Sequence, residues 1–327
     1  MSDVARLAGV SAQTVSRTLS GAGPVAARTR ERVLAAVEEL GYKPDLSAQT
    51  LATGRSRTVG VLMTGNLSYG RIRSYIAVER RERERGNFVV SATADADDTD
   101  SLLAALKHLQ SVHIKALAIL GQRADAVSFL APYLDQPTVV ALNDPVPGGH
   151  FSRVEVDQHA GVRDLVDHMC ERGCRRLVLV VPAGVDVDAR ARQRAFESLC
   201  LERGIGYEVV TSAGWGCEDG AAVAGEVGAR SPEGVLAGND HLACGLAYGL
   251  AERGLKVGRD YALSGFDDTE FGAFMQPALT SVSQDMGRLA EAISIELDRV
   301  AAGGEPRHTV LPARLVVRAS TTGFQAG

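Results

Sequence analysis

Aromatic residues, cysteines and long apolar runs are scarce in this chain of 327 residues. Phe, Trp and Tyr together make up 5% of it, and Trp215 is the single tryptophan. The five cysteines are an odd number without the companion histidines of a zinc set, so we expect free thiols and no metal site. No apolar run approaches the length of a membrane span and the amino terminus is polar, so we expect no signal peptide, no membrane contact and a cytoplasmic protein.

Signatures of common enzyme classes are missing too. The chain has no Walker loop, no Gly-x-Ser-x-Gly elbow and no His-Glu-x-x-His motif. Its Gly214-x-Gly216-x-x-x-Gly220 run is one residue too long for a dinucleotide fingerprint. The acidic run at 95–100 lacks the glycine and the glutamate of a calcium loop, so we predict a polar turn before a helix. We therefore expect a protein without catalytic residues and without a cofactor.

Charge is unevenly distributed along the chain. The whole carries a net charge of -5, which by itself disfavours binding to DNA. Up to Arg57 there are eight Lys or Arg against five Asp or Glu, a balance of +3, whereas the remainder has 27 against 35, a balance of -8. The basic surplus therefore lies on the amino-terminal part, where it can neutralise the phosphates of DNA.

The amino-terminal residues have the pattern of two short helices joined by a tight turn. Val4, Leu7 and Ala8 fall at helical spacing, Gly9 interrupts the run, and Ser11 can cap a second helix in which Val15 and Leu19 share a buried face. The outer face of that helix carries Gln13, Thr14, Ser16 and Arg17. Amide, hydroxyl and guanidinium groups of this kind bind base edges and phosphates in the major groove, so the pattern predicts a helix-turn-helix. An ordinary small helical bundle with a polar outer face is the alternative.

Two further helices are predicted before residue 57. The stretch 25–40 forms the third helix of a small core, with an apolar stripe of Val33, Val37 and Leu40. Thr29 near its start is a further candidate contact to DNA. Residues 46–53 are too few to hold a helix alone in water, so we expect this helix to fold when two copies pack together over DNA.

From residue 58 onwards, short apolar strands alternate with helical patterns. We predict strands at 58–63, 87–91, 116–120, 138–142, 177–181, 208–211, 234–237 and 262–266. Strands that are buried on both faces and separated by helices form parallel sheets in doubly wound α/β units. Residues 57–327 are enough for two such units.

Polar and aromatic side chains follow several of these strands. Because ligands of open parallel sheets bind beyond the carboxyl ends of the strands, we expect Arg192, Trp215, Asn239 and Asp267 to meet at one rim. Planar polar groups beside an aromatic ring suit a sugar. Structural alternatives remain: Trp215 as a packed interdomain aromatic, Asn239 and Asp267 as helix caps, and at least one of Arg190, Arg192 and Arg194 as a solvated charge.

Six motifs are spread over nearly the whole chain. They are Asp3-Val4-Ala5, Val15-Ser16-Arg17, Ala48-x-x-Leu51, Asn239-Asp240-x-x-Ala243-x-Gly245, Gly265-Phe266-Asp267-Asp268 and Ser281-Val282-x-Gln284-Asp285. Together they resemble the lactose/galactose repressor (LacI/GalR) family of transcription factors. The resemblance implies a helix-turn-helix head at 1–44, a hinge helix and linker at 45–56, and a two-lobed, periplasmic-binding-protein-like core at 57–327. Its N-lobe would hold about 57–156 plus 284–313, and its C-lobe about 157–283 plus 314–323.

The resemblance also implies roles for single residues. Arg192 and Asp267 correspond to a central pair that binds sugar hydroxyls, with Trp215, Asn239 and Gln284 as supporting contacts and Thr64 from the other lobe. The residues that would contact DNA are Ser11, Gln13, Thr14, Ser16, Arg17, Thr29, Ala48 and Leu51. Ala48 would let two hinge helices approach closely, and Leu51 would wedge into the minor groove.

The function implied is that of a repressor that binds a pseudo-palindromic operator as a homodimer. A small sugar or glycoside bound between the lobes would release it. No leucine heptads follow the last predicted strand, so we expect a dimer without a tetramerising tail. The alternatives are a corepressor-dependent regulator that senses a sugar phosphate or a purine, and a two-lobed sugar-binding protein without a DNA role.

Overall fold

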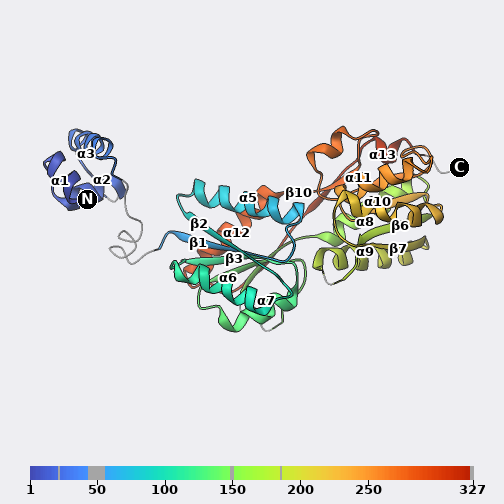
Figure 1. Ribbon diagram of the computed structural model, residues 1–327, viewed down its shortest axis with the longest axis horizontal. Coiled ribbons are helices and arrows are strands. Elements are labelled where there is room, and N and C mark those ends of the chain that lie inside the picture. Colours follow the sequence, from blue (N-terminus) through green and yellow to red (C-terminus); the bar gives the residue numbers. More distant parts are fainter. Residues whose placement is uncertain (21–22, 43–55, 148–150, 185, 325–327) are drawn as a thin grey trace. The chain divides into compact units, whose positions relative to one another are not determined.

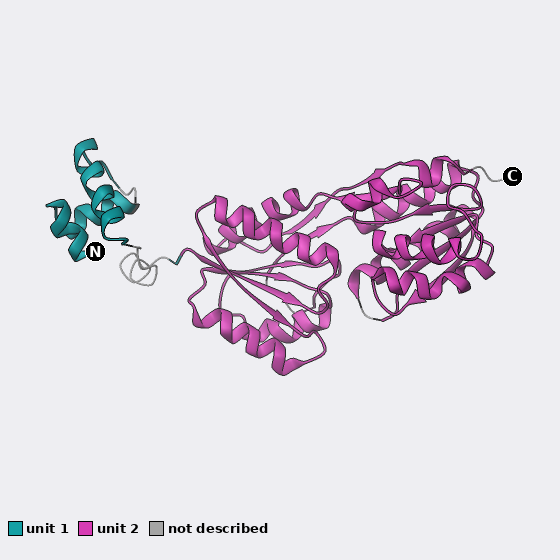
Figure 2. Ribbon diagram, turned by 45° about the horizontal axis from the view of Figure 1, so that its top comes forward, with its two compact units in different colours: residues 1–56 teal, residues 57–327 magenta. Residues whose placement is uncertain are grey.

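A computed structural model describes residues 1–20, 23–42, 56–147, 151–184 and 186–324 (Figure 1). The chain divides into two compact units, Met1–Ser56 and Arg57–Gly327 (Figure 2). The predicted hinge helix, with Ala48 and Leu51, lies outside the described residues.

In its described residues, the first unit, which we call the head, contains three helices. They are α1 Ser2–Ala8, α2 Ala12–Ser20 and α3 Ala27–Glu39. Gly9 ends α1 in the left-handed region at φ 61°, a conformation that glycine adopts without strain. Val4, Val15 and Val33 have no exposed surface, so one side chain from each helix forms the core.

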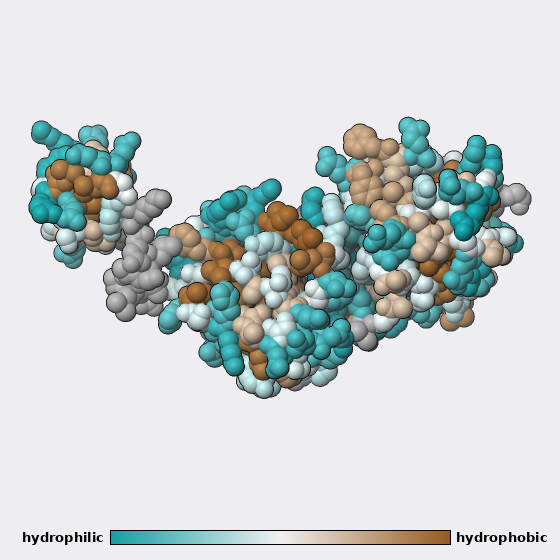
Figure 3. All heavy atoms as spheres, in the orientation of Figure 1, coloured by the Kyte–Doolittle hydropathy of each residue, from teal (hydrophilic) through white to brown (hydrophobic). Residues whose placement is uncertain are grey.

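Three leucines of the head remain exposed at the surface. Leu7, Leu34 and Leu40 are 46%, 49% and 45% exposed, and Figure 3 shows apolar side chains gathered on the head. The prediction that Leu40 lies on the buried stripe of the third helix is wrong. The helix ends at Glu39, so Leu40 falls beyond its last turn, and Ala36 takes the buried position beside Val33.

The N-lobe of the second unit is built on a six-stranded parallel sheet in the order β11-β5-β4-β3-β1-β2. Its strands are β1 Thr58–Thr64, β2 Phe88–Ala94, β3 Ala116–Leu120, β4 Thr138–Ala141, β5 Ser152–Val156 and β11 His308–Leu311. Its helices are α5 Tyr69–Glu84, α6 Thr99–Ser111, α7 Ala124–Leu130 with the 3-10 turn η1 Ala131–Tyr133, and α12 Met286–Ala301. Val61 packs in the cluster that holds Ile293 of α12, whereas its neighbour Leu62 packs with Leu102 of α6. Both faces of the sheet are therefore covered by helices, as predicted.

The C-lobe repeats this arrangement around a four-stranded parallel sheet in the order β7-β6-β8-β9. Its strands are β6 Arg176–Pro182, β7 Gly206–Ser212, β8 Gly234–Ala237 and β9 Ala262–Ser264. Its helices are α8 Gln158–Glu171, α9 Val187–Arg203, α10 Cys217–Ala229, α11 Asp240–Ala251 and α13 Ala319–Thr322, with the 3-10 turn η2 Glu270–Phe274. Leu179 packs with Phe196 of α9, and the next residue, Val180, packs on the other face with Leu246 of α11.

A small antiparallel ribbon accompanies the passage between the lobes. It pairs β10 Ser281–Gln284 with β12 Ala313–Val316, so that Gln284 lies opposite Ala313. The chain passes between the lobes after β5, after β10 and after β11, since α12 and β11 belong to the N-lobe and α13 packs against β9 of the C-lobe. Side chains from both lobes can therefore lie close together within a few residues of these crossings.

Several local predictions can be compared with the structure. Strands β5, β10, β11 and β12 were not predicted; β5 alternates apolar and polar residues, and the other three are only four residues long, β10 carrying two serines and a glutamine. Asp98 caps α6 through its carboxylate, which accepts hydrogen bonds from the amides of Asp100 and Ser101, so the predicted polar turn is confirmed. All five cysteines are free thiols.

Candidate functional site

The exposed face of α2 carries the side chains predicted to contact DNA. Val15 is fully buried, which turns Gln13, Ser16 and Arg17 toward solvent, while Thr14 is half-buried. Helical geometry puts these side chains on the turns around the buried stripe. The structure therefore presents an amide, a hydroxyl and a guanidinium together from the start of one short helix.

Ser11 and Thr14 order the start of this helix. The Ser11 hydroxyl accepts a hydrogen bond from the amide of Thr14 at 3.2 Å, as the predicted cap requires, and lies 2.9 Å from Thr14 Oγ1. Thr18 is buried and donates its hydroxyl to the Thr14 carbonyl at 2.8 Å. These contacts fix the entry of the helix, so the exposed side chains project from a rigid start. Thr29, half-buried near the start of α3, stays a predicted DNA contact.

Arg32 is a structural residue of the head that the sequence pattern does not single out. Its Nη2 donates to the carbonyl oxygens of Ala8 and Gly9 at the end of α1. The arginine of α3 thus satisfies helix-terminal acceptors that have no partner inside α1. The run of Arg28, Arg30 and Arg32 looks from the sequence like a uniform basic surface, and only the fold distinguishes the third from the other two.

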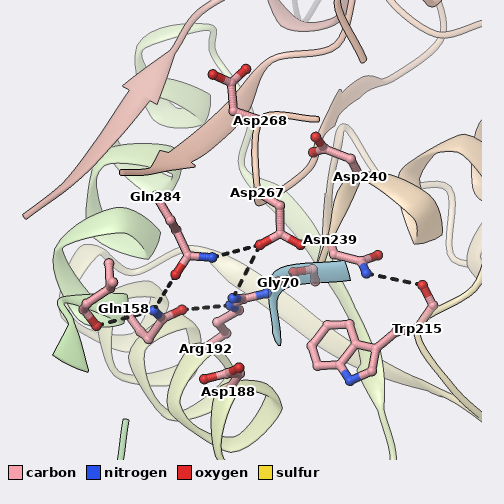
Figure 4. A network of polar contacts seen from close by, with 12 residues as sticks. Gly70, Gln158, Asp188, Arg192, Trp215, Asn239, Asp240, Asp267, Asp268 and Gln284 are labelled. Atoms are coloured by element: carbon pink, nitrogen blue, oxygen red, sulfur yellow. Dashed lines mark hydrogen bonds and ion pairs between the residues drawn. The ribbon is translucent and has the colours of Figure 1, made fainter. Parts of the chain in front are cut away.

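In the second unit, Arg192 lies at the centre of a buried polar group between α8, α9 and the strand ends (Figure 4). It is 4% exposed, although it is a charged residue on a helix with two exposed arginine neighbours. Its Nε donates to Gln158 Oε1 at 2.9 Å, and its Nη1 donates to the Gly238 carbonyl. The guanidinium lies 3.8 Å from the centroid of the Phe266 ring.

Gln158, Arg192, Asp267 and Gln284 form a closed set of contacts, which we call the Arg192 cluster. Gln284 donates to Asp267 Oδ1 at 2.7 Å and accepts from Gln158 Nε2 at 3.1 Å. Asp267 Oδ1 lies 3.9 Å from Arg192 Nη2, so carboxylate and guanidinium face each other without direct hydrogen bonding. The structure thus brings together Arg192, Asp267 and Gln284, three predicted ligand residues from separate parts of the chain.

Burial controls the charge of Asp267. It raises the pKa of this carboxyl to about 7, more than the neighbouring Arg192 charge and the Gln284 hydrogen bond lower it. Asp267 also adopts a left-handed backbone conformation at φ 101°, which is strained for a residue with a side chain. The surrounding fold holds it there: its amide donates to the Val282 carbonyl at 2.8 Å. Asp267 does not cap a helix, which removes the structural alternative for this residue.

Asn239 takes the structural role that was left open for it. It caps α11, where its Oδ1 accepts from the amide of Leu242 at 2.8 Å. Its Nδ2 donates to the Trp215 carbonyl at 3.1 Å, and the residue is 3% exposed. Asn239 therefore orders the loop that carries Trp215.

Trp215 joins a second polar group, which we call the Asp186 cluster. Asp186 caps α9, and its Oδ2 accepts from Trp215 Nε1 at 3.3 Å, from Gln122 Nε2 at 3.0 Å and from Arg71 Nη2 at 3.2 Å. Burial opposes the ionised form, but the Arg71 charge and the Gln122 hydrogen bond hold the pKa of Asp186 below its ordinary value. Arg71 and Gln122 belong to the N-lobe, so this carboxylate joins the two lobes.

Thr64, the predicted contribution of the N-lobe, lies at the end of β1 with no exposed surface. Its Oγ1 accepts from the amide of Gln122 at 3.3 Å. Thr64 therefore positions the loop after β3, whose Gln122 side chain reaches Asp186.

A cavity of about 60 Å³ lies at the carboxyl ends of the N-lobe strands. Its polar lining comes from both lobes and includes Arg71, Asn143, Asp188 and Gln284. Gly70 also lines it, and a Cβ atom on Gly70 would lie 3.9 Å from Asp267 Oδ1. Ligand pockets usually hold roughly 300–1,000 Å³, so a sugar needs the lobes to move apart or side chains to shift.

Comparison with known proteins gives two family matches. A model of the bacterial regulatory proteins of the lacI family matches residues 1–45, and a periplasmic binding protein-like domain matches residues 166–321. The chain belongs to the LacI family. The parts of the chain that these models cover hold the exposed face of α2 and most of the Arg192 cluster.

Full-length relatives of this LacI-family chain are transcriptional regulators. The lactose operon repressor of Escherichia coli (strain K12) is 28% identical, over 98% of this chain and 89% of the relative. The HTH-type transcriptional regulator CelR of Thermobifida fusca is 29% identical, over 97% of this chain and 96% of the relative. Neither name denotes an enzyme.

Solved structures of the family extend the likeness to three dimensions. The lac repressor dimer bound to operator and the anti-inducer ONPF matches with a TM-score of 0.85 at 28% identity, covering 98% of both chains. A CelR–cellobiose complex matches with a TM-score of 0.73 at 26% identity, covering 97% of this chain and 98% of the other. The three-helix head and the two-lobed α/β core of this protein are thus the LacI-family fold.

Four residues of the two clusters were not singled out from the sequence: Gln158, Arg71, Gln122 and Asp186. Gln158 follows β5, so a prediction of that strand would have placed it at the rim. Arg71 and Asp186 lie near the start of helices, where polar residues are common, and their pairing across the lobes leaves no mark in the sequence.

Metal and membrane features can be assessed for the described part of the chain. Its His, Cys, Asp and Glu residues form no group of three that could hold a metal ion. Within the same residues, no helix is both long and apolar enough to cross a bilayer.

Proposed function

We propose that this LacI-family protein is a transcriptional repressor that binds a pseudo-palindromic operator as a dimer and is released by a neutral sugar or glycoside. The observation that carries the proposal is the exposed set of Gln13, Ser16 and Arg17 on a capped helix, joined in one chain to a buried polar site of the sugar-binding type. Relatives with the same two parts carry the names of repressors.

The head supplies sequence recognition through side chains of two kinds. Arginine forms paired hydrogen bonds with guanine, and glutamine with adenine, and each good pair contributes roughly 1–3 kcal/mol of discrimination. Gln13 and Arg17 lie four residues apart on one exposed helix face, so both can enter one major groove. Ser11, Thr14 and Thr29 would contact the phosphates beside it.

Two copies are needed to read a pseudo-palindrome. On α5, Ile72 and Ile76 lie one turn apart and are 40% and 44% exposed. An apolar pair on an outer helix face is covered when a second copy packs against it. Ile76→Glu is expected to convert the dimer to monomer in sedimentation, whereas an unchanged mass would place the interface elsewhere.

The hinge residues Ala48 and Leu51 complete the proposed operator contact. A wedge of this kind separates base pairs and bends the minor groove open. Leu51→Ala should therefore weaken operator binding and leave effector affinity in DNA-free protein unchanged. Operator binding equal to that of wild type would remove the wedge.

The effector side of the proposal rests on the Arg192 cluster. Adjacent hydroxyls of a sugar ring can bind to the N–H donors of Arg192 and Gln284 and to the carboxyl oxygen acceptor of Asp267. The neighbouring loop is ordered by the hydrogen bond between Asn239 and the Trp215 carbonyl. Thr64 contributes from the N-lobe through its hold on Gln122. A ligand shifts the lobes only as far as it binds the two arrangements with different affinity, and operator DNA then weakens effector binding by the same factor.

Two measurements test the function. Selection of random duplexes by the purified protein should give one pseudo-palindromic sequence, and anisotropy should then show its release by a sugar. Release by a neutral sugar supports the proposal. If the protein binds the operator more tightly in the presence of a purine or sugar phosphate, the effector is a corepressor and not an inducer. If no sequence is selected, the proposed operator binding is wrong.

A further inference from the structure

Arg71 of α5 has an unusual position for a charged residue. It is 6% exposed, and its Nε and Nη2 are bound inside the protein, to the Asn66 carbonyl at 2.8 Å and to Asp186 Oδ2 at 3.2 Å. Among the residues that the structure describes, its Nη1 meets no hydrogen-bond acceptor. Buried donors are almost always paired, because an unpaired one loses its water without compensation.

The same residue lines the cavity at the carboxyl ends of the N-lobe strands. Asp188 of the C-lobe and Gln284 at the crossing between the lobes line that cavity as well. Gln284 also belongs to the Arg192 cluster, so the cavity adjoins the group that would bind the first sugar ring. A substituent on that ring that points to the N-lobe would therefore reach Arg71.

We propose that Arg71 recognises the part of the effector that faces the N-lobe. Its Nη1 donates there to an oxygen of a neutral group, such as the second ring of a disaccharide, and so disfavours an apolar aglycone. The inference rests on the proposed function and names the ligand class of the same site. An oxygen acceptor satisfies Nη1, whereas an alkyl group leaves the guanidinium buried and unpaired.

The charges around the cavity favour a neutral group over an anion. Asp188 lines the same cavity as the arginine. An anionic ligand would be repelled by the Asp188 carboxylate, while a hydroxyl can accept from Arg71 and donate to Asp188. The charge of Arg71 is already balanced by Asp186, to which it is tied.

Arg71 also connects ligand reading with the contact between the lobes. Its Nη2 binds Asp186, the cap of α9, which is further held by Gln122 of the N-lobe. The Gln122 carbonyl accepts from the amide of Val187 at 3.0 Å, so backbone and side chains join the lobes at this point. A ligand oxygen that accepts from Nη1 would therefore bind a side chain that already connects the two lobes.

The test compares four probes by calorimetry: cellobiose, lactose, hexyl β-D-glucopyranoside and hexyl β-D-galactopyranoside. Each hexyl glycoside keeps the first ring of one disaccharide and replaces the second ring by an apolar chain. The wild-type protein should prefer the disaccharide in at least one pair by about tenfold or more, because the alkyl chain leaves a buried donor unpaired. Arg71→Met should remove this preference or reverse it.

Three further variants keep the result interpretable. Arg71→Met/Asp186→Leu removes both charges, so it avoids an unpaired carboxylate if the single variant folds poorly. Asp186→Asn retains Arg71 and should keep most of the preference. Arg163→Met replaces an exposed arginine of α8, whose side chain is 47% exposed, and should behave as wild type.

The outcomes separate the inference from the proposed function. Binding of probes with equal affinity within each pair, or a preference that survives Arg71→Met and the double variant, overturns the role of Arg71 and leaves a sugar sensor. Methyl β-D-glucuronide serves as a fifth, anionic probe, and its tighter binding than that of cellobiose overturns the neutral class. Binding of none of these sugars by the wild-type protein contradicts the proposed effector itself.

Discussion

The two candidate binding surfaces of this protein are built in opposite ways. On α2 the predicted DNA contacts Gln13, Ser16 and Arg17 are exposed, and the fold below them depends on Val15. In the core, the side chains of Arg192 and Asp267 are buried, and each is already bound by other residues of the chain. A surface that binds a large charged partner can remain exposed to water before binding. A site for a small neutral ligand must exclude water, because only then do its hydrogen bonds distinguish one ligand from another.

The comparison predicts that substitutions in the core cost both stability and binding, while those on α2 cost binding alone. Arg192→Met should show the largest effect, because it leaves Asp267 and Gln158 without their buried partner. We expect a loss of about 3–5 kcal/mol of unfolding free energy, together with loss of effector binding. Denaturant unfolding and calorimetry measure the two. A variant of wild-type stability would mean that the site relaxes around the missing charge.

Arg17→Ala should separate binding from stability on the head. We expect a loss of roughly 1–3 kcal/mol in operator binding if Arg17 pairs with a base. The melting temperature should stay unchanged, because the side chain is exposed. Gln13→Ala provides the same test for the second base contact. Anisotropy at one fixed salt concentration measures the affinity, and a drop in melting temperature of similar size would contradict the separation.

The carboxyl of Asp267 should make core stability depend on pH. Its pKa of about 7 in the folded protein lies above the ordinary value of 3.8, so the folded state holds the proton between these values while the unfolded state loses it. Stability of wild type relative to Asp267→Asn should therefore fall as pH rises from about 4 to 7, by up to about 1.4 kcal/mol per pH unit, and level off above. Melting curves of both proteins over this range give the difference, which would be flat if Asp267 were ionised throughout.

The smallest effect is expected for Trp215→Phe. It removes one hydrogen bond to Asp186 and keeps an aromatic ring beside Gly238. We expect a loss of about 0.5–1.5 kcal/mol in stability. A much larger loss of sugar affinity than of stability would place the indole in direct contact with the ligand. Equal losses would support the role of a packed interdomain aromatic.

Sequence patterns were most informative where structure is local. Helix periodicity, the Ser11 cap and the polar turn at 95–100 predicted elements that the structure contains, since each depends on residues within one or two turns. Predictions failed at element ends and at long-range pairs. Leu40 was placed in the core although its helix ends one residue earlier. Glu82 lies among the alternating charges of 80–85, yet it is 1% exposed and accepts a hydrogen bond from Asn87, which directly precedes β2.

By itself, the sequence determined the three helices of the head, the alternation of strands and helices in the core, and the residue types at the rim, because spacing and chemistry are properties of the chain. Only the tertiary structure decided which of those polar residues face each other. Arg71 and Asp186 are 115 positions apart, and Arg192 differs from Arg190 and Arg194 only in the direction that α9 gives it. Such pairs form when the two lobes pack and exclude water. Which charged residues become buried partners therefore depends on burial, and burial cannot be read from a single stretch of sequence.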